Sequence, residues 1–387
     1  MGMKINEKIV YVAVLLFSVI FLFVGNRVAS SGLDFFDEFE GLTYYNAVVV
    51  EIVDRSYSDW DYGGTHIFFD ARITSGARRG DIITAQQYLG RFSIYDNEKE
   101  VEISDRVVIV HEDWGDNYHF ANYARINYIL ILGGIFLILV ILFAKKKGFN
   151  AIVSLGFTCV AVFWVFIPAI LSGKNIYIAT IIISIFSIVT TLLLVIGVNR
   201  KTFSAMLGCL GGVFLAGVLM FAMDIIMGLT GIVDQETRSL LFIPTEDPIN
   251  LRAIVFAGVI IGAMGAILDV AVSISSSLWE VRAAGGVNDF GGIVKSGINI
   301  GKDILGTMLN TLILAYIGSS LSLILLITVH TNSPIELFNM EMIIVEFLRA
   351  LVGSLGMLLT IPLTSVMCGW LYSEDLEEGS GDRLRLS

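Results

Sequence analysis

The chain has 387 residues, of which 55% are hydrophobic and 16% are charged, and its mean hydropathy is +0.78. Soluble domains usually carry about 25% charged residues, so this composition excludes an ordinary soluble protein. Several runs of about 20 apolar residues predict an α-helical membrane protein. The net charge of −11 is uneven, because residues 26–126 hold 18 Asp and Glu against 9 Lys and Arg. No basic patch is interleaved with aromatic residues, so we expect no nucleic-acid partner.

The first element is an apolar run at residues 9–25, preceded by a short segment that carries Lys4 and Lys8. Cleaved signal peptides usually have an apolar core of about 7–15 residues, and this run is longer. We therefore predict an uncleaved N-terminal signal-anchor helix within residues 1–25. The small residues at 28–30 keep a cleaved signal peptide as the alternative.

Residues 26–125 form a polar block that predicts a β-rich domain. Short segments rich in β-branched and aromatic residues are separated by turn signals such as Gly63-Gly64 and Ser75-Gly76. About five strands at this spacing indicate a small antiparallel barrel or sandwich of OB-like or SH3-like size. The acidic loop at 111–119 contains several metal-ligand types, but its spacing matches no standard site, so we expect no metal there.

Seven further apolar runs predict a helical bundle over residues 126–372, so that we expect about eight transmembrane helices in all. Their expected positions are 126–143, 149–171, 176–198, 203–227, a sixth helix of the chain that starts near 247, 304–329 and 342–371. Asp247 would cap the sixth helix, and Pro248 would suit its first turn. The glycine-rich segment 278–303 predicts a flexible or re-entrant connection. The acidic residues 373–387 predict a disordered tail.

Basic residues in the short loops predict the orientation. The loops at 145–147, 200–201 and 282–302 carry Lys and Arg, share a side with Lys4 and Lys8, and alternate with loops poor in basic residues. The positive-inside rule therefore places both termini in the cytoplasm and the β-rich domain outside the cell membrane. The expected partners are the lipid bilayer and either a second copy of the chain or another membrane protein.

The sixth helix carries an acid within a membrane-length run. Gly258, Gly262, Gly265, Asp269 and Ser273 follow one another at intervals of three or four residues, so they share one helix face. Small residues on one face permit close helix packing, and Asp269 would then be held by a neighbouring polar group. Acids inside membrane spans also mark ion and proton pathways, so the second interpretation is a polar pathway with Asp269 binding a cation or proton.

The seventh helix offers partners for this acid. Asp303, Thr307 and Asn310 share one helix face. Asp269 lies far along a helix that descends from outside, and Asn310 lies about 10 Å above the inner end of its own helix. We therefore predict one inner polar layer that contains Asp269, Ser273, Thr307 and Asn310.

A second polar layer is predicted nearer the outside. Glu346 and Arg349 are three residues apart on the eighth helix and can pair with each other. Asp224 interrupts the fifth helix at a comparable height, so an ion pair between Asp224 and Arg349 is a further expectation. Such a pair either lines a pathway or fixes helix packing. Gly208 and Gly212 form another small-residue face, which we interpret as helix packing.

The residues indicate neither an enzyme nor a bound cofactor. The chain has no GxSxG, HExxH or phosphate-loop motif. Asp224 and Asp269 lie on different helices, as a catalytic dyad requires, but they are predicted at different depths and lack a GxGD pattern. Cys159, Cys209 and Cys368 fall in separate apolar runs, which predicts buried thiols rather than a disulfide framework or metal site.

Two segments carry a family resemblance. GAMGAILDVAVSISSSLWEV and SGINIGKDILGTMLNTLILAYIGSSL resemble the signature region of the YibE/F-like bacterial membrane proteins. The wider order of an anchor, a β-rich block and a helical bundle is similar over roughly residues 40–370. The resemblance implies this architecture, and it brings no catalytic or ligand-binding residues.

Two functions remain open at this point. The intramembrane acids favour a transporter or permease-like protein whose pathway passes Asp269. The β-rich domain favours a non-transporting envelope scaffold or assembly factor, which would use that domain to bind a partner.

Overall fold

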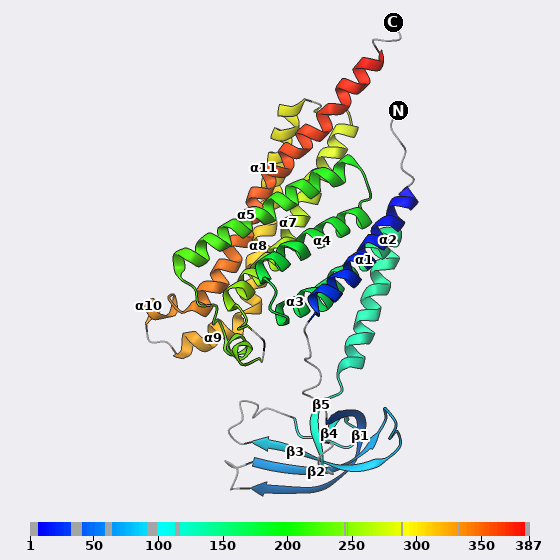
Figure 1. Ribbon diagram of the computed structural model, residues 1–387, viewed down its shortest axis with the longest axis vertical. Coiled ribbons are helices and arrows are strands. Elements are labelled where there is room, and N and C mark those ends of the chain that lie inside the picture. Colours follow the sequence, from blue (N-terminus) through cyan, green and yellow to red (C-terminus); the bar gives the residue numbers. More distant parts are fainter. Residues whose placement is uncertain are drawn as a thin grey trace. The chain divides into compact units, whose positions relative to one another are not determined.

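The structure is a computed structural model with seven helices, among the residues it describes, that are long and apolar enough to cross a membrane, and with a five-stranded barrel (Figure 1). The described residues are 7–31, 41–58, 64–90, 99–112, 117–243, 245, 247–287, 289–330 and 333–383. The chain divides into two compact units, Asp34–Phe143 and the combination of Met1–Leu33 with Ala144–Ser387. Each unit is described by itself.

The strands form a closed barrel in the order β1-β2-β3-β5-β4. Their bounds are β1 Leu42–Ser58, β2 Gly64–Ile73, β3 Ile82–Gly90, β4 Arg106–Glu112 and β5 Tyr118–Tyr123. All pairs are antiparallel except β3 with β5, and β4 pairs with β1 to close the barrel. This is the topology of an OB-type barrel. Alternate residues point inward, so Val49, Phe69, Ala85 and Ile109 fill its core.

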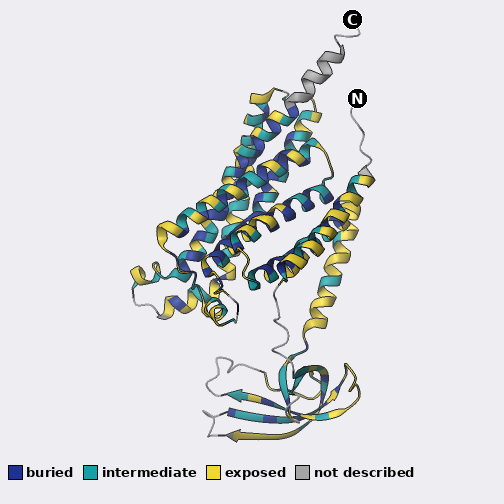
Figure 2. Ribbon diagram, in the orientation of Figure 1, coloured by how far each residue is buried: buried dark blue, intermediate teal, exposed yellow. Residues whose placement is uncertain are grey.

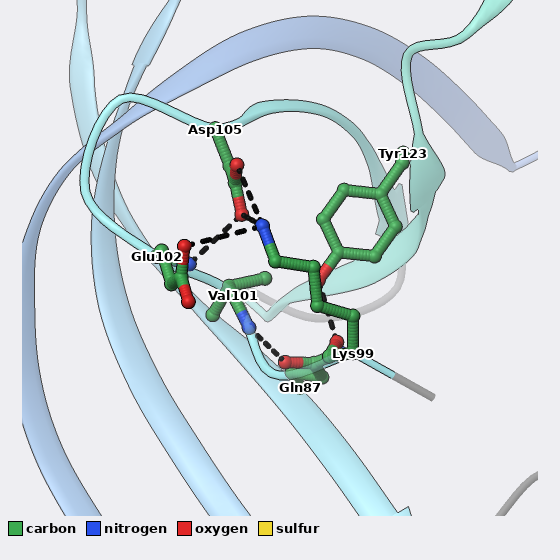
Figure 3. A network of polar contacts seen from close by, with 6 residues as sticks. All are labelled: Gln87, Lys99, Val101, Glu102, Asp105 and Tyr123. Atoms are coloured by element: carbon green, nitrogen blue, oxygen red, sulfur yellow. Dashed lines mark hydrogen bonds and ion pairs between the residues drawn. The ribbon is translucent and has the colours of Figure 1, made fainter. Parts of the chain in front are cut away.

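A polar network holds residues 99–105, which precede β4, against the barrel (Figure 3). Gln87 Oε1 accepts from the Val101 amide at 2.9 Å, and Tyr123 Oη donates to the Lys99 carbonyl at 2.5 Å. Lys99 Nζ contacts Asp105 at 3.0 Å, and this hydrogen bond raises the pKa of Lys99. Burial raises the pKa of Tyr123. Both groups therefore hold their protons more tightly in the folded barrel.

The helices account for most of the remaining chain (Figure 1). Their bounds are α1 Glu7–Ala29, α2 Ile126–Ala161, a π-helical turn Val162–Phe166, α3 Ile167–Leu171, α4 Ile176–Val195, α5 Arg200–Met227, α6 Gln235–Ser239, a 3-10 turn Leu240–Phe242, α7 Leu251–Ala283, α8 Phe290–Ser319, α9 Leu321–His330, α10 Pro334–Leu337 and α11 Glu341–Arg383.

The second and third predicted runs join in one helical stretch. Together they lie in the helical stretch Ile126–Leu171, which is 46 residues long. The backbone leaves helical geometry at Lys145, where φ is 50° and ψ is −125°. The break falls within the basic residues 145–147, where the sequence predicted a loop.

Two sequence predictions about helix ends are wrong. The sixth predicted helix, α7, begins at Leu251, because the Asn250 side chain caps it by accepting from the Ala253 amide at 3.1 Å. Asp247 and Pro248 therefore precede the helix. The predicted run 304–329 is divided at Ser320 into α8 and α9.

The glycine-rich segment 278–303 is mostly helical, because α7 continues to Ala283 and α8 begins at Phe290, so the predicted flexible or re-entrant connection is wrong for these helical residues. Asp289 caps α8 by accepting from the Gly292 amide at 2.8 Å. Gly297 and Gly301 then face α11, where an added Cβ would overlap Ser365 and Ile361. Close packing thus outweighs the low helix propensity of glycine. At the other end, α11 continues to Arg383 through much of the predicted disordered tail, and residues 384–387 lie outside the described part.

The core of the helical unit lies among α4, α5, α7, α8 and α11 (Figure 2). On α7, Val259, Ile267 and Ile274 are fully buried there. Other helix faces expose large apolar side chains, such as Phe214 at 68% and Ile226 at 74%. Apolar surface of this kind is what lipid contact requires. Cys209 and Cys368 are buried as predicted, whereas Cys159 is exposed.

Candidate functional site

Gly208 and Gly212 lie where α5 packs against α11. An added Cβ would overlap the Thr364 hydroxyl at the first position and the Thr360 hydroxyl at the second. The helices therefore approach closely enough that only glycine fits on α5. These two positions pack as the sequence predicted.

The glycine face of α7 is different, because it is open. Gly258, Gly262 and Gly265 are exposed. An added Cβ at Gly265 would meet no atom within 4 Å, and at Gly262 it would meet only the Tyr316 hydroxyl at 3.2 Å. No other described helix therefore packs its backbone closely against this face. The tight packing seam that was one interpretation of the sequence does not form here.

Asp269 continues this open face and lies in a pocket of about 470 Å³ between α4, α7 and α8. The described residues that line the pocket are Thr191, Leu192, Val195, Ile196, Leu268, Asp269, Val272, Ser273 and Met308. Asp269 is exposed to this space and is the single charged group in that lining. Among the contacts of the described residues, its carboxylate has no hydrogen-bond or ion-pair partner.

Two hydroxyl groups share the pocket with Asp269. Ser273 lies one helical turn further along α7. Thr191 comes from α4, and its Oγ1 accepts a hydrogen bond from Ser154 at 2.7 Å, which orients the hydroxyl. The remaining walls are aliphatic or Met308. An acid with two hydroxyls in an otherwise apolar pocket provides oxygen ligands for a cation or an acceptor for a proton.

The predicted inner layer is only half formed. Asp269 and Ser273 line the pocket, but Thr307, Asn310 and Asp303 are exposed on α8 and do not line it. The residue that α8 contributes is Met308. The sequence showed which α8 residues share a face, but the contact of Gly301 with α11 turns that face away from α7.

A polar cluster lies at the other end of the glycine face. Arg349 Nη1 pairs with Glu346 Oε1 at 2.7 Å, as the three-residue spacing predicted, and Ser320 Oγ donates to Glu346 Oε2 at 2.6 Å. An added Cβ on Gly258 would lie 3.9 Å from Arg349 Nη2. The open face of α7 therefore runs between this cluster and Asp269.

The predicted pair between Asp224 and Arg349 does not form among the described residues. Arg349 is engaged by Glu346, while Asp224 is 7% exposed and its Oδ1 has no hydrogen-bond partner within the described chain. Asp224 lies one turn before the end of α5, and its backbone carbonyl accepts from Gly228. It is therefore a buried acid separate from the Glu346 cluster.

Sequence reasoning missed a buried network that joins α5, α7 and α11. Ser204 Oγ lies 2.9 Å from Ser275 Oγ and 3.2 Å from Tyr372 Oη, and Ser275 Oγ donates to the Lys201 carbonyl at 2.7 Å. Each hydroxyl is unremarkable within its own helix, so no sequence spacing marks the group. The network joins these three helices beside the stretch of α7 that lines the Asp269 pocket.

The barrel has a pocket of its own, of about 310 Å³, on β3 and β5. Its described lining is Gln86, Tyr88, His119, Phe120 and Ala121. His66 contacts Gln86 by a hydrogen bond and lies 4.8 Å from the Tyr88 ring, centroid to centroid. The metal-ligand types noted at 111–119 form no cluster of three among the described residues, and residues 113–116 lie outside that set.

Comparison with known proteins adds one match. A family model described as YibE/F-like protein matches residues 132–374, which begin within α2 and end within α11. The match includes the Asp269 pocket and the Glu346 cluster, and it leaves out the barrel. No curated protein and no solved structure matches the chain.

Proposed function

We infer, from the premise that the chain belongs to the YibE/F-like family, that it is a multi-pass membrane protein that moves a cation or proton. Its seven long apolar helices support the membrane assignment. The single observation that supports transport is Asp269, an acid of a membrane-length helix that is exposed to a pocket and has no ion-pair or hydrogen-bond partner among the described residues. Holding such a charge in lipid is costly, so a functional role is the default interpretation.

The route follows the open face of α7. Asp269 follows Gly258, which lies beside Arg349, by eleven residues, or about 16 Å along the helix. Gly262 and Gly265 lie between them and present backbone rather than bulky side chains. The route therefore links the polar cluster of Glu346 and Arg349 to the oxygen ligands of the pocket.

The negative charge of Asp269 determines which kind of ion the pocket binds. Among the described residues that line the pocket, Asp269 is the charged one, and Ser273 and Thr191 add neutral oxygens. This donor set suits protons and hard cations and disfavours anions. Binding and release at a carboxylate need no covalent chemistry, so the proposal is for a carrier rather than an enzyme.

The proposed orientation rests on the basic short loops. Residues 145–147 and 200–201 lie on one side of the membrane with the N-terminus, which is the cytoplasmic side by the positive-inside rule. The protein then lies in the cell membrane, and its barrel is on the extracytoplasmic side.

Reconstitution of the full chain tests the proposal. Vesicles that contain the purified protein and the pH dye pyranine should acidify faster than protein-free vesicles when valinomycin and a potassium gradient impose an inside-negative potential. A parallel arm follows ²²Na⁺ uptake. Flux of either ion above the protein-free level is the expected result, and flux of neither contradicts transport.

The barrel pocket favours a second candidate, an envelope scaffold or assembly factor. Tyr88, Phe120 and His119 present aromatic and hydrogen-bonding groups on one face, which is the type of surface that OB-type barrels use for ligands. Under this alternative, deletion of residues 41–124 would remove the cellular phenotype of the protein, while Asp269 variants would keep it.

A further inference from the structure

The outer face of α8 carries polar side chains that the described residues leave unsatisfied. Asn299, Lys302, Asp303 and Asn310 are exposed. No hydrogen bond or ion pair within the described chain engages Lys302, Asp303 or Asn310. Yet α8 is one of the seven membrane-length helices, and only 6% of its most apolar window is buried.

This face points away from the bundle. Gly301 faces α11, because an added Cβ there would overlap Ile361. Asn310 follows Gly301 by nine residues, which is about 2.5 helical turns and places it on the opposite side of the helix. Gly306 lies on the same outward face as Asn310, and an added Cβ there would meet no atom within 4 Å.

Lipid hydrocarbon provides no hydrogen-bond partners for these polar side chains of α8. An amide in hydrocarbon loses hydrogen bonds that it makes in water, and charged side chains within a span need a partner or access to water. Asparagine side chains in membrane helices therefore bond across helix interfaces, and small residues beside them permit close approach. The outward face of α8 has both features.

We propose that this face of α8 binds the same face of a second copy of the chain, forming a two-fold symmetric dimer. An axis along the membrane normal brings identical positions together at one depth. Asn310 suits such a contact, because its amide is both donor and acceptor and two copies satisfy each other. Lys302 of each copy likewise meets Asp303 of the other, and Gly306 allows the helices to approach.

Self-complementarity is what selects a second copy over an unrelated membrane protein. Lys302 and Asp303 are adjacent and opposite in charge, so they need a partner that places an acid opposite Lys302 and a base opposite Asp303 at the same depth. The two-fold related copy does so. The proposal rests on the membrane location proposed above but not on transport. Its readout is assembly, so loss of flux and loss of the dimer are distinguishable.

Disulfide trapping tests the contact. In a chain whose Cys159, Cys209 and Cys368 are replaced by alanine, Asn310→Cys should form a covalent homodimer in native membranes after mild oxidation. Ala315→Cys is the matched control, because Ala315 is also exposed but follows Asn310 by five residues, which places it about 140° around the helix. A product of the mass of two chains is expected at 310 and not at 315. Absence of that product at 310, or its replacement by a link to a different protein, overturns the proposal.

A charge exchange provides the second measurement and does not depend on cysteines. Lys302→Asp and Asp303→Lys should each weaken the dimer in vesicles, and the double variant should restore it, because the reversed pair is again self-complementary. Asn310→Leu should raise the dimer dissociation constant about tenfold, since an interhelical amide contact contributes about 1–2 kcal/mol. A double variant as weak as the single ones contradicts a two-fold contact.

Discussion

Replacing Asp269 with asparagine should reduce ion flux in reconstituted vesicles to the level of protein-free vesicles. The amide has the shape of the acid but neither its charge nor its capacity to take up a proton at neutral pH. Because Asp269 is the single charged residue in the described pocket lining, no neighbour there replaces it. The measurement is pyranine-monitored acidification under an imposed potential.

Folding should be unaffected by this substitution. The carboxylate makes no hydrogen bond or ion pair with the described residues, so its loss orphans no partner. Glu280→Gln is the matched control, because Glu280 is an exposed acid near the end of the same helix and outside the pocket. Equal flux in the Asp269→Asn and Glu280→Gln proteins would remove Asp269 from the mechanism.

Replacing Gly212 with alanine should sharply destabilise the helical unit. The new Cβ would overlap Thr360 Oγ1 and lie 3.1 Å from Ile267 Cγ2. Overpacking of this kind costs about 3 kcal/mol, because α5 and α11 must separate to relieve it. The expected result is a lower unfolding midpoint in detergent and less protein in the membrane.

Two variants separate overpacking from a general effect of alanine. Thr360→Gly in the Gly212→Ala protein removes the overlapping group and should restore most of the lost stability. Gly156→Ala adds the same methyl group where no atom lies within 4 Å, and it should change stability little. A destabilised Gly156→Ala protein, or a double variant without recovery, would contradict the packing explanation.

The apolar runs predicted most of the helices, because membrane length and composition are local properties of the chain. They failed at residues 278–303, where glycine and polar residues indicated a connection. There Gly297 and Gly301 serve close contact with α11, and such a contact between distant segments is invisible in a local window. The five-stranded barrel was predictable from strand spacing, while its closure depends on the pairing of β1 with β4.

The candidate site was predictable in part. Asp269 and Ser273 share a helix face, which spacing alone reveals. Their true neighbours, Thr191 and Met308, depend on how α4 and α8 are rotated about their axes. The same rotation turned Asn310 outward, so a residue expected in the pathway became the centre of the proposed dimer contact.

Access of water to the α7 face tests the central claim most directly. In the chain without native cysteines, Gly265→Cys and Ser273→Cys should react with a charged, membrane-impermeant thiosulfonate reagent. Ala263→Cys, on the same helix but with 0% exposure, should remain unreactive. Labelling at 265 and 273 with none at 263 is the predicted result. If residues 265 and 273 are as unreactive as 263, the face is sealed or covered by lipid, and the pathway along α7 is contradicted.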